Sequence, residues 1–213
     1  MNFLKKFFKI LISIILIVFL LGFGISAYAT YTRPAQYVDI VDKYAKENNL
    51  DPLLSLSIIK VESNFNPDAT SDVGAVGLMQ VMPDTAKSIN EIKGTNFTKE
   101  DLRDPEKNIQ IGSEYISYLI NHFNNKDLAF AAYNGGIGNV NSWLSNESYS
   151  KDGKTLDSIP SSETKYYVVK VNNQYDVYNL FYKGEELREN MNKSPKTWIK
   201  NYFKILKDII KNY

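Results

Sequence analysis

The sequence predicts a mainly α-helical protein with one transmembrane helix at its N-terminus. Apolar residues recur every three or four positions in several segments of ordinary helical length, which places them on one face of a helix. Turns that contain Asn, Gly or Pro separate these segments, and such residues end helices. In addition, residues 10–29 form an apolar run without a charged residue, which is long enough to cross a bilayer.

Composition limits the function without choosing it. The chain has 213 residues, which suits one domain with accessory segments. The formal net charge is +1, so the chain lacks the basic bias of nucleic-acid-binding proteins. It contains no cysteine, which excludes disulfides and thiolate metal sites. Its 15 tyrosines either build a core or line a groove for sugars or peptides.

Residues 1–29 are predicted to be a membrane anchor or a signal segment, followed by a short linker at 30–36. Three lysines precede the apolar run and only Arg33 follows it closely, so the N-terminus is expected inside the cell and the rest outside. The sequence AYA that ends at Ala29 also matches a signal-peptidase site. The apolar run is longer than the roughly 7–15 residues of a signal core, which favours an uncleaved anchor. Both interpretations export the domain that follows.

The domain predicted at 37–182 begins with two helices. Helical spacing in the first is shown by four residues, Val38, Val41, Tyr44 and Ala45. The second helix is expected to begin at Pro52 with Asp51 as its N-cap, because proline suits the first helical turn. It should end near Asn64, because the residue before Pro67 disfavours helical geometry.

A loop with two glycines follows, and the next helix is expected to open near Pro83. Residues 90–104 are polar and are predicted to form turns. The segment 105–123 is predicted to be a long helix, since apolar or small residues form one stripe along it. These residues are Ile109, Gly112, Ile116 and Leu119.

Two short helices are predicted within 127–144, separated by Asn134, Gly135 and Gly136. A polar loop follows, and then a last helix after Pro160. The residues in phase on this last helix are Thr164, Val168, Val171, Tyr175 and Tyr178. The long helical period outweighs the strand-like sequence VVKV within it.

Residues 183–213 are predicted to form a basic amphipathic helix. The pattern lies in residues 193–213, where the apolar face comprises Trp198, Tyr202, Phe203, Leu206 and Ile210 and six lysines oppose the single acid Asp208. One interpretation is a helix packed on the domain with a solvated basic face. The other is a helix that lies on anionic lipid or on a cell-wall polymer.

Glu62 is the residue most indicative of chemistry. It follows an apolar helical segment, and Ile58, Ile59 and Phe65 are expected to share its face because residues three and four apart are stacked. Those neighbours would remove water from the carboxyl group and raise its pKa. A carboxylic acid that stays protonated near neutral pH is suited to general acid catalysis. The alternative is an ordinary glutamate at a helix end, paired with a lysine.

Two further segments contain candidate binding residues. In GAVGLMQVMP the glycines indicate a tight backbone path or close approach of a ligand, and Gln80 is either a buried, satisfied amide or a donor that faces a groove. Tyr133 and Asn134 lie at a predicted helix end. The lone His122 is interpreted as an exposed helix residue. The sequence has no phosphate-binding loop and no cluster of metal ligands, so neither a metal nor a cofactor is predicted.

Four blocks in order resemble the motifs of the soluble lytic transglycosylase family: IIKVESNFNPDATSDVGAVGLMQVMPDTA, NIQIGSEYISYL, AFAAYNGGIGNV and IPSSETKYYVVKV. The resemblance covers residues 37–182. It implies a goose-lysozyme-like fold and cleavage of the β-1,4 bond between N-acetylmuramic acid and N-acetylglucosamine in peptidoglycan, without added water. The products would carry 1,6-anhydromuramoyl ends.

The resemblance also assigns roles to single residues. It implies Glu62 as the catalytic acid and then base, with Ser63 and Glu163 as residues that support it. The substrate-binding residues that it implies are Met79, Gln80, Tyr133, Asn134 and Tyr167. One departure is Val76, which stands where the family often has a serine near the glutamate or the bound sugar.

Two rival functions remain open from the sequence. Asp68 or Asp72 could hold a water molecule, which would make the protein a hydrolytic lysozyme, since hydrolytic glycosidases use two carboxyl groups. Val76 is the one hint of a non-catalytic peptidoglycan-binding module. The expected partners are peptidoglycan strands and, through residues 10–29, the cytoplasmic membrane; the protein is expected to be a monomer.

Overall fold

The computed structural model describes residues 2–31, 37–182, 203–204, 207–208 and 211. It divides into two compact units, one formed by residues 37–178 and the other by residues 1–36 and 179–213. Most of the basic helix predicted at 183–213 lies outside the described residues, so both interpretations of that segment stay predictions.

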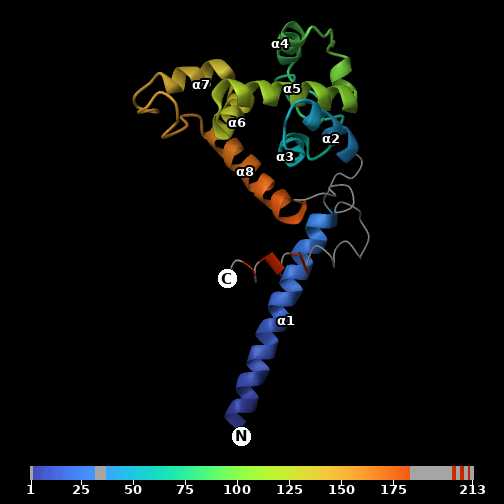
Figure 1. Ribbon diagram of the computed structural model, residues 1–213, viewed down its shortest axis with the longest axis vertical. Helices are drawn as coiled ribbons and strands as arrows, with labels where there is room; N and C mark the ends of the chain where they lie inside the picture. The colour runs from blue at the N-terminus through green and yellow to red at the C-terminus, as the bar shows by residue number, and fades with distance from the viewer. Residues whose placement is uncertain (1, 32–36, 183–202, 205–206, 209–210, 212–213) are drawn as a thin grey trace. The chain divides into compact units, whose positions relative to one another are not determined.

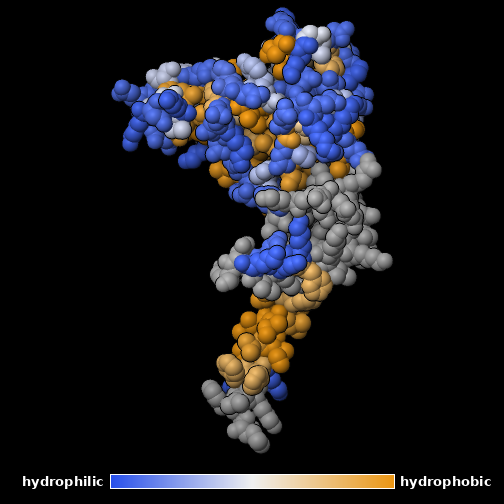
Figure 2. Space-filling model, in the orientation of Figure 1, coloured by the Kyte–Doolittle hydropathy of each residue, from blue (hydrophilic) through white to orange (hydrophobic). Residues whose placement is uncertain are grey.

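The N-terminal helix α1 spans Asn2–Tyr31 and therefore continues two residues into the linker predicted at 30–36. Its segment Lys6–Gly24 is long and apolar enough to cross a membrane. Large apolar side chains between Phe7 and Leu21 are exposed along it, and Figure 2 shows them as a hydrophobic stretch. Such exposure is costly in water and favourable in lipid, which agrees with the predicted anchor.

The unit at residues 37–178 is built from helices, as predicted. Its elements are α2 (Val38–Glu47), α3 (Pro52–Ser63), α4 (Pro83–Lys93), the 3₁₀ helix η1 (Asp101–Arg103), α5 (Pro105–Phe123), α6 (Lys126–Gly135), α7 (Ile137–Leu144) and α8 (Ser162–Tyr182). Within the described ranges there is no β-strand, and two isolated bridges join Thr70 to Val76 and Val76 to Val81.

Helix α5 lies at the centre of this unit and packs against α2, α4 and α6 (Figure 1). Asp104 caps its start by accepting a hydrogen bond from the Lys107 amide at 2.9 Å. The stripe predicted for this helix is buried throughout. The burial of that stripe in the unit's core explains why the long periodic segment is helical.

Helix α3 begins as predicted, with the Asp51 carboxylate accepting a hydrogen bond from the Leu53 amide at 2.9 Å. It ends at Ser63, because Asn64 has a left-handed φ of 50°. Phe65 is also left-handed, with φ of 64°, which is rare for a bulky residue. The prediction that Phe65 shares the helical face of Glu62 was therefore wrong, since the chain has already turned away from the helix.

Helix α4 extends to Lys93, so the turn predicted at 90–104 starts four residues too early. The side chain of Asn90 explains the error, because its oxygen accepts hydrogen bonds from the Phe97 amide at 2.9 Å and the Thr95 hydroxyl at 2.8 Å. A polar residue thus joins the helix end to the turn that follows. Gly94 then ends the helix with a left-handed φ of 69°, as glycine commonly does.

Helix α8 is joined to two other helices by side-chain hydrogen bonds. The Tyr175 hydroxyl donates to the Asp51 carboxylate at 2.7 Å, at the start of α3. Asn172 donates to Asp127 of α6 at 2.9 Å. Val171, directly before Asn172, is fully buried. These contacts hold the part of α8 that follows Tyr167 against the start of α3 and against α6.

Candidate active site

Glu62 lies in the last turn of α3 and is half-buried. The Tyr167 hydroxyl of α8 donates a hydrogen bond to its Oε1 atom at 2.7 Å, across 105 positions of sequence. Tyr167 itself is only 5% exposed. Two residues assigned to the site by the sequence blocks therefore meet directly, and the carboxyl group has a fixed position.

Burial raises the pKa of the Glu62 carboxyl group from its ordinary value of 4.5 to about 7. The Tyr167 hydrogen bond and the positive charge of Lys170 act in the opposite direction, because both favour the carboxylate. On the helix itself, Ile58 and Ile59 are fully buried, as predicted for residues that exclude water here. A pKa near 7 lets one group give a proton and take one back under the same conditions.

Tyr133, at the end of α6, is the second tyrosine of the site. Its hydroxyl donates to the Met79 carbonyl oxygen at 2.8 Å, and its ring lies 5.3 Å from that of Tyr115. Burial and the nearby charge of Glu62 raise its pKa well above the usual value, so it stays a neutral hydrogen-bond donor. The Met79 side chain, predicted to bind substrate, is fully buried. It therefore packs beneath the surface of the site and does not face a ligand.

Asn108 holds the loop between α3 and α4 in place, and the sequence analysis missed it. Its side-chain oxygen accepts from the Met79 amide, and its nitrogen donates to the Val76 and Leu102 carbonyl oxygens, each at 2.8 Å. The side chain has no exposed surface. The sequence offered one sign of this role, a polar residue directly before Ile109 of the apolar stripe. A side-chain amide that is buried at such a position must be hydrogen-bonded, so it can hold a neighbouring segment.

Two glycines allow close packing around this loop. Gly77 has φ of 81°, and an added Cβ atom would lie 2.6 Å from the Leu102 carbonyl oxygen. An added Cβ atom at Gly112 of α5 would lie 2.8 Å from that of Met79. The structure thus accounts for Gly77 by a tight backbone path, one of the two explanations that the sequence left open.

Gln80 uses its amide nitrogen within the loop. The Nε2 atom donates to the Ala69 carbonyl oxygen at 3.1 Å and to that of Gly77 at 2.9 Å. Its backbone is left-handed, with φ of 48°. Both hydrogens of the amide nitrogen therefore already make hydrogen bonds within the loop. The side-chain oxygen is the atom that can accept a hydrogen bond from a ligand.

The other predicted residues occupy different environments. The Ser63 hydroxyl donates to the Leu78 carbonyl oxygen at 2.7 Å and joins α3 to the loop. Asn134 is half-buried and Glu163 is exposed; no hydrogen bond of either side chain occurs among the described residues. Val76 is 2% exposed and exchanges two backbone hydrogen bonds with Val81, so a valine suits this position by packing.

Asp68 and Asp72, the carboxylates of the hydrolytic alternative, are both exposed in the loop. Neither contributes to the pKa of Glu62.

A cavity of about 260 Å³ lies between α4, α5 and the start of α7. Tyr115, Tyr118 and Ile137 line it, and Tyr115 connects it to Tyr133. Tyr133 and Tyr115 therefore connect the Glu62 carboxyl group to this cavity, which is called the groove below.

The fold and this arrangement define a lysozyme-like domain with the half-buried carboxyl group of Glu62 at its candidate site. The sequence profile of the transglycosylase SLT domain matches residues 39–156, more than half of the chain. The protein belongs to this family of transglycosylase SLT domains.

Known relatives agree with this assignment. Over 161 residues the chain is 38% identical to the soluble lytic murein transglycosylase of Salmonella typhimurium, covering 72% of this chain and 24% of that protein. It is 34% identical to the membrane-bound lytic murein transglycosylase C of Edwardsiella ictaluri, covering 68% and 47%. The chain thus spans about a quarter of the length of the soluble relatives.

Solved structures show the same fold. The 70 kDa soluble lytic transglycosylase from Escherichia coli superposes with a TM-score of 0.63 at 34% identity, covering 73% of this chain and 26% of that one. An inactive mutant of the lytic transglycosylase Slt from Pseudomonas aeruginosa, in which glutamine replaces a glutamate, superposes with a TM-score of 0.61 at 36% identity, covering 68% and 24%.

Replacing Tyr167 by Phe is expected to move the alkaline limb of the pH profile of kcat/KM upward from about 7. The lost hydrogen bond favours the carboxylate of Glu62, so its removal raises the pKa of the acid. Activity at the optimum should also fall by about ten- to a hundredfold, because the acid is less well positioned. Lys165→Gln on the same helix is the control, and an unmoved limb in Tyr167→Phe would contradict the assignment.

Proposed function

We propose that this protein is a peptidoglycan lytic transglycosylase that cleaves the bond between N-acetylmuramic acid and N-acetylglucosamine and forms 1,6-anhydromuramoyl ends. The observation that carries the proposal is Glu62, a half-buried carboxyl group with its pKa raised to about 7 and a tyrosine hydroxyl 2.7 Å away. The family to which the chain belongs and the names of its relatives support this substrate.

The chemistry requires one carboxyl group used twice. Protonated Glu62 gives its proton to the glycosidic oxygen, and the bond from that oxygen to the anomeric carbon of the muramic acid breaks. The sugar's N-acetyl group assists at the anomeric carbon. Glu62, now a carboxylate, takes the proton of the 6-hydroxyl, whose oxygen bonds to the anomeric carbon. Because the nucleophile belongs to the same sugar, its effective concentration is high and no water molecule has to be activated.

The surrounding residues orient the sugar and the acid in this proposal. Tyr167 fixes the carboxyl group, and Tyr133, Asn134 and the Gln80 side-chain oxygen face the bound strand. Glu163 lies one helical turn before Tyr167 on α8, which places both on the same side of the helix. We therefore assign Glu163 to support of the site rather than to proton transfer.

The helix α1 supports action at the cell surface. The family includes membrane-bound relatives, and α1 carries an apolar segment of membrane-spanning length. We propose a single-pass protein with its catalytic domain outside the cytoplasmic membrane, in accord with the lysines that precede the apolar segment. The intact mass of the mature protein tests this anchor, because cleavage near Ala29 would instead release a secreted enzyme.

Mass analysis of the digestion products of purified peptidoglycan tests the proposed reaction. We expect muropeptides with anhydromuramoyl ends, each lighter by one water molecule than the corresponding hydrolysis product. Reducing muramic acid ends would identify a hydrolytic lysozyme instead. Binding of peptidoglycan without any cleavage would identify a non-catalytic module.

A further inference from the structure

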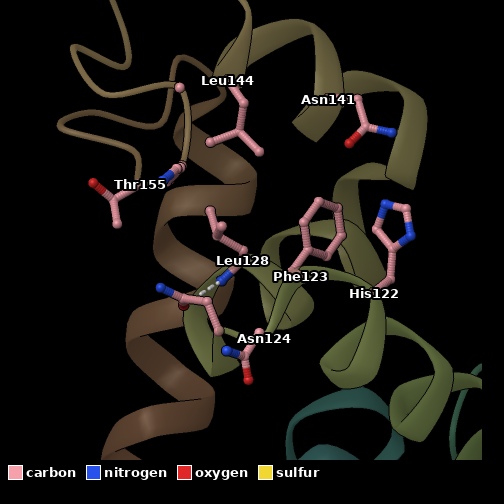
Figure 3. A pocket seen from close by; sticks show the side chains of 10 residues that line it. His122, Phe123, Asn124, Leu128, Asn141, Leu144 and Thr155 are labelled. Atoms are coloured by element: carbon pink, nitrogen blue, oxygen red, sulfur yellow. Dashed lines mark hydrogen bonds between the residues drawn. The ribbon is translucent and has the colours of Figure 1, made fainter.

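A second cavity, of about 520 Å³, lies where the end of α5 meets α6 and α7 (Figure 3). Its volume is in the range of small-molecule sites in proteins. Three segments form it: the end of α5 with the link to α6, the second half of α7, and the loop that contains Thr155. None of its ten lining residues is an acid.

The cavity combines an apolar floor with unused amide groups. Phe123, Leu128 and Leu144 point toward one another in its middle, and Asn141 lies beside His122 at one edge (Figure 3). Neither the Asn141 side chain nor the Asn124 side chain makes a hydrogen bond among the described residues. The side-chain oxygen of Asn125 accepts hydrogen bonds from the Asp127 and Leu128 amides, whereas its NH₂ group makes none among the described residues.

These groups match the chemistry of an acetamido sugar. The apolar face of a sugar ring packs on aliphatic and aromatic side chains, whereas its hydroxyl and acetamido groups need both donors and acceptors. Asparagine side chains supply both. The lining has no acidic side chain and contains one lysine, Lys154, so a ligand meets the hydrogen-bonding groups of the asparagines together with one positive charge.

The structure also connects this cavity to the groove lined by Tyr115, Tyr118 and Ile137. The rings of Tyr118 and His122 stack 6.0 Å apart with an angle of 29° between their planes, and Tyr118 lines the groove while His122 lines the cavity. Helix α7 makes the same connection, since Ile137 lines the groove and Asn141 the cavity. Both helices therefore run from one hollow to the other.

The spacing suits an extended strand. Tyr115 contacts Tyr133 of the active site and lies seven residues before His122, which is roughly 10 Å along a helix. Tyr115 and Tyr118 are half-buried and His122 is exposed, so this aromatic stripe of α5 is open along its length. Aromatic rings in a row provide apolar area at little entropic cost.

We propose that the cavity at the end of α5 binds an acetamido sugar of the glycan strand several units away from the bond that is cut. The stripe of Tyr115, Tyr118 and His122 guides the strand from Glu62 to this distal site. The inference rests on the proposed function, because it requires a glycan strand at Glu62. It adds a second point of attachment, which favours long strands over short fragments.

The test uses calorimetry to compare the binding of neutral chitooligosaccharides of two lengths to full-length Glu62→Gln protein, in which cleavage is expected to be slowed by about 10²–10⁴-fold. The parent is expected to bind the octamer about tenfold more tightly than the tetramer, a gain equivalent to 1.4 kcal/mol. Adding His122→Ala and Asn141→Ala should reduce this gain to less than about twofold, while the affinity for the tetramer reports on the groove. Asn121→Ala, exposed and next to His122, is the matched control and should keep the full gain.

The possible outcomes separate this proposal from the proposed function. An equal gain in the double variant, or no gain in the parent, overturns the distal site while leaving cleavage at Glu62 intact. A gain that appears only with strands carrying stem peptides, and is lost in the double variant, assigns the cavity to peptide and overturns the sugar proposal. Failure of both oligomers and of peptidoglycan to bind would instead contradict the proposed function.

Discussion

Glu62→Gln is expected to lower the cleavage of peptidoglycan by about 10²–10⁴-fold, the usual contribution of a general acid. Glutamine keeps the shape and accepts the Tyr167 hydrogen bond, but it carries no proton to give to the glycosidic oxygen. The measurement is the rate at which soluble muropeptides with anhydro ends appear, quantified by mass spectrometry. Binding of the glycan should persist, so the loss belongs to kcat rather than to KM.

The free energy of unfolding of the same variant shows whether any loss of activity comes from unfolding. Its difference from that of the parent should change with pH in a direction that follows from the pKa of Glu62. In the folded protein the Glu62 pKa is about 7, against an ordinary value of 4.5. Between these values the folded state retains a proton that the unfolded state has released, so the parent loses stability as pH rises from 4.5 to 7. Glutamine does not ionise and avoids this loss.

We therefore expect parent and Glu62→Gln to have similar free energies of unfolding at pH 4. At pH 8 the variant should be more stable by on the order of 1–3 kcal/mol. Denaturant titrations at both pH values measure this. A variant that is inactive because it unfolds would show the reverse order at pH 8, and full activity in Glu62→Gln would eliminate Glu62 as the acid.

Asn108→Leu is expected to lower the free energy of unfolding by about 2–5 kcal/mol. Leucine has a similar size but leaves the Met79 amide and the Leu102 carbonyl group without the hydrogen bonds that Asn108 now makes. The Val76 carbonyl oxygen keeps a bond from the Val81 amide. Urea denaturation followed by circular dichroism measures the loss.

Asn121→Ala is the matched comparison for Asn108, since it changes the same residue type on the same helix at an exposed position. It should alter stability by no more than about 0.5 kcal/mol. Equal stability of the Asn108 and Asn121 variants would show that the loop does not depend on the buried amide.

We also expect the Asn108 variant to lose activity. Asn108 holds the Met79 amide, and the Met79 carbonyl oxygen accepts the hydrogen bond that positions Tyr133.

Much of the helical framework could be predicted because its signals are local. The four residues Val38, Val41, Tyr44 and Ala45 are the buried residues of α2, and the Asp51 cap forms as expected. Errors arose where a polar side chain bonds to the turn that follows its helix, as at Asn90, or where the backbone is left-handed, as at Phe65. Neither case changes the hydrophobic period that identifies a helix.

The helices, the apolar N-terminal segment and Glu62 as a candidate acid follow from local patterns, because helical period, capping and apolar neighbours of a carboxyl group are properties of adjacent residues. Three contacts required the folded chain: Tyr167 bonds to Glu62, Asn108 holds the loop, and the Gln80 amide donates to backbone oxygens. These contacts join residues that are distant along the chain or folded within one loop. They depend on how whole helices pack, which no local pattern specifies.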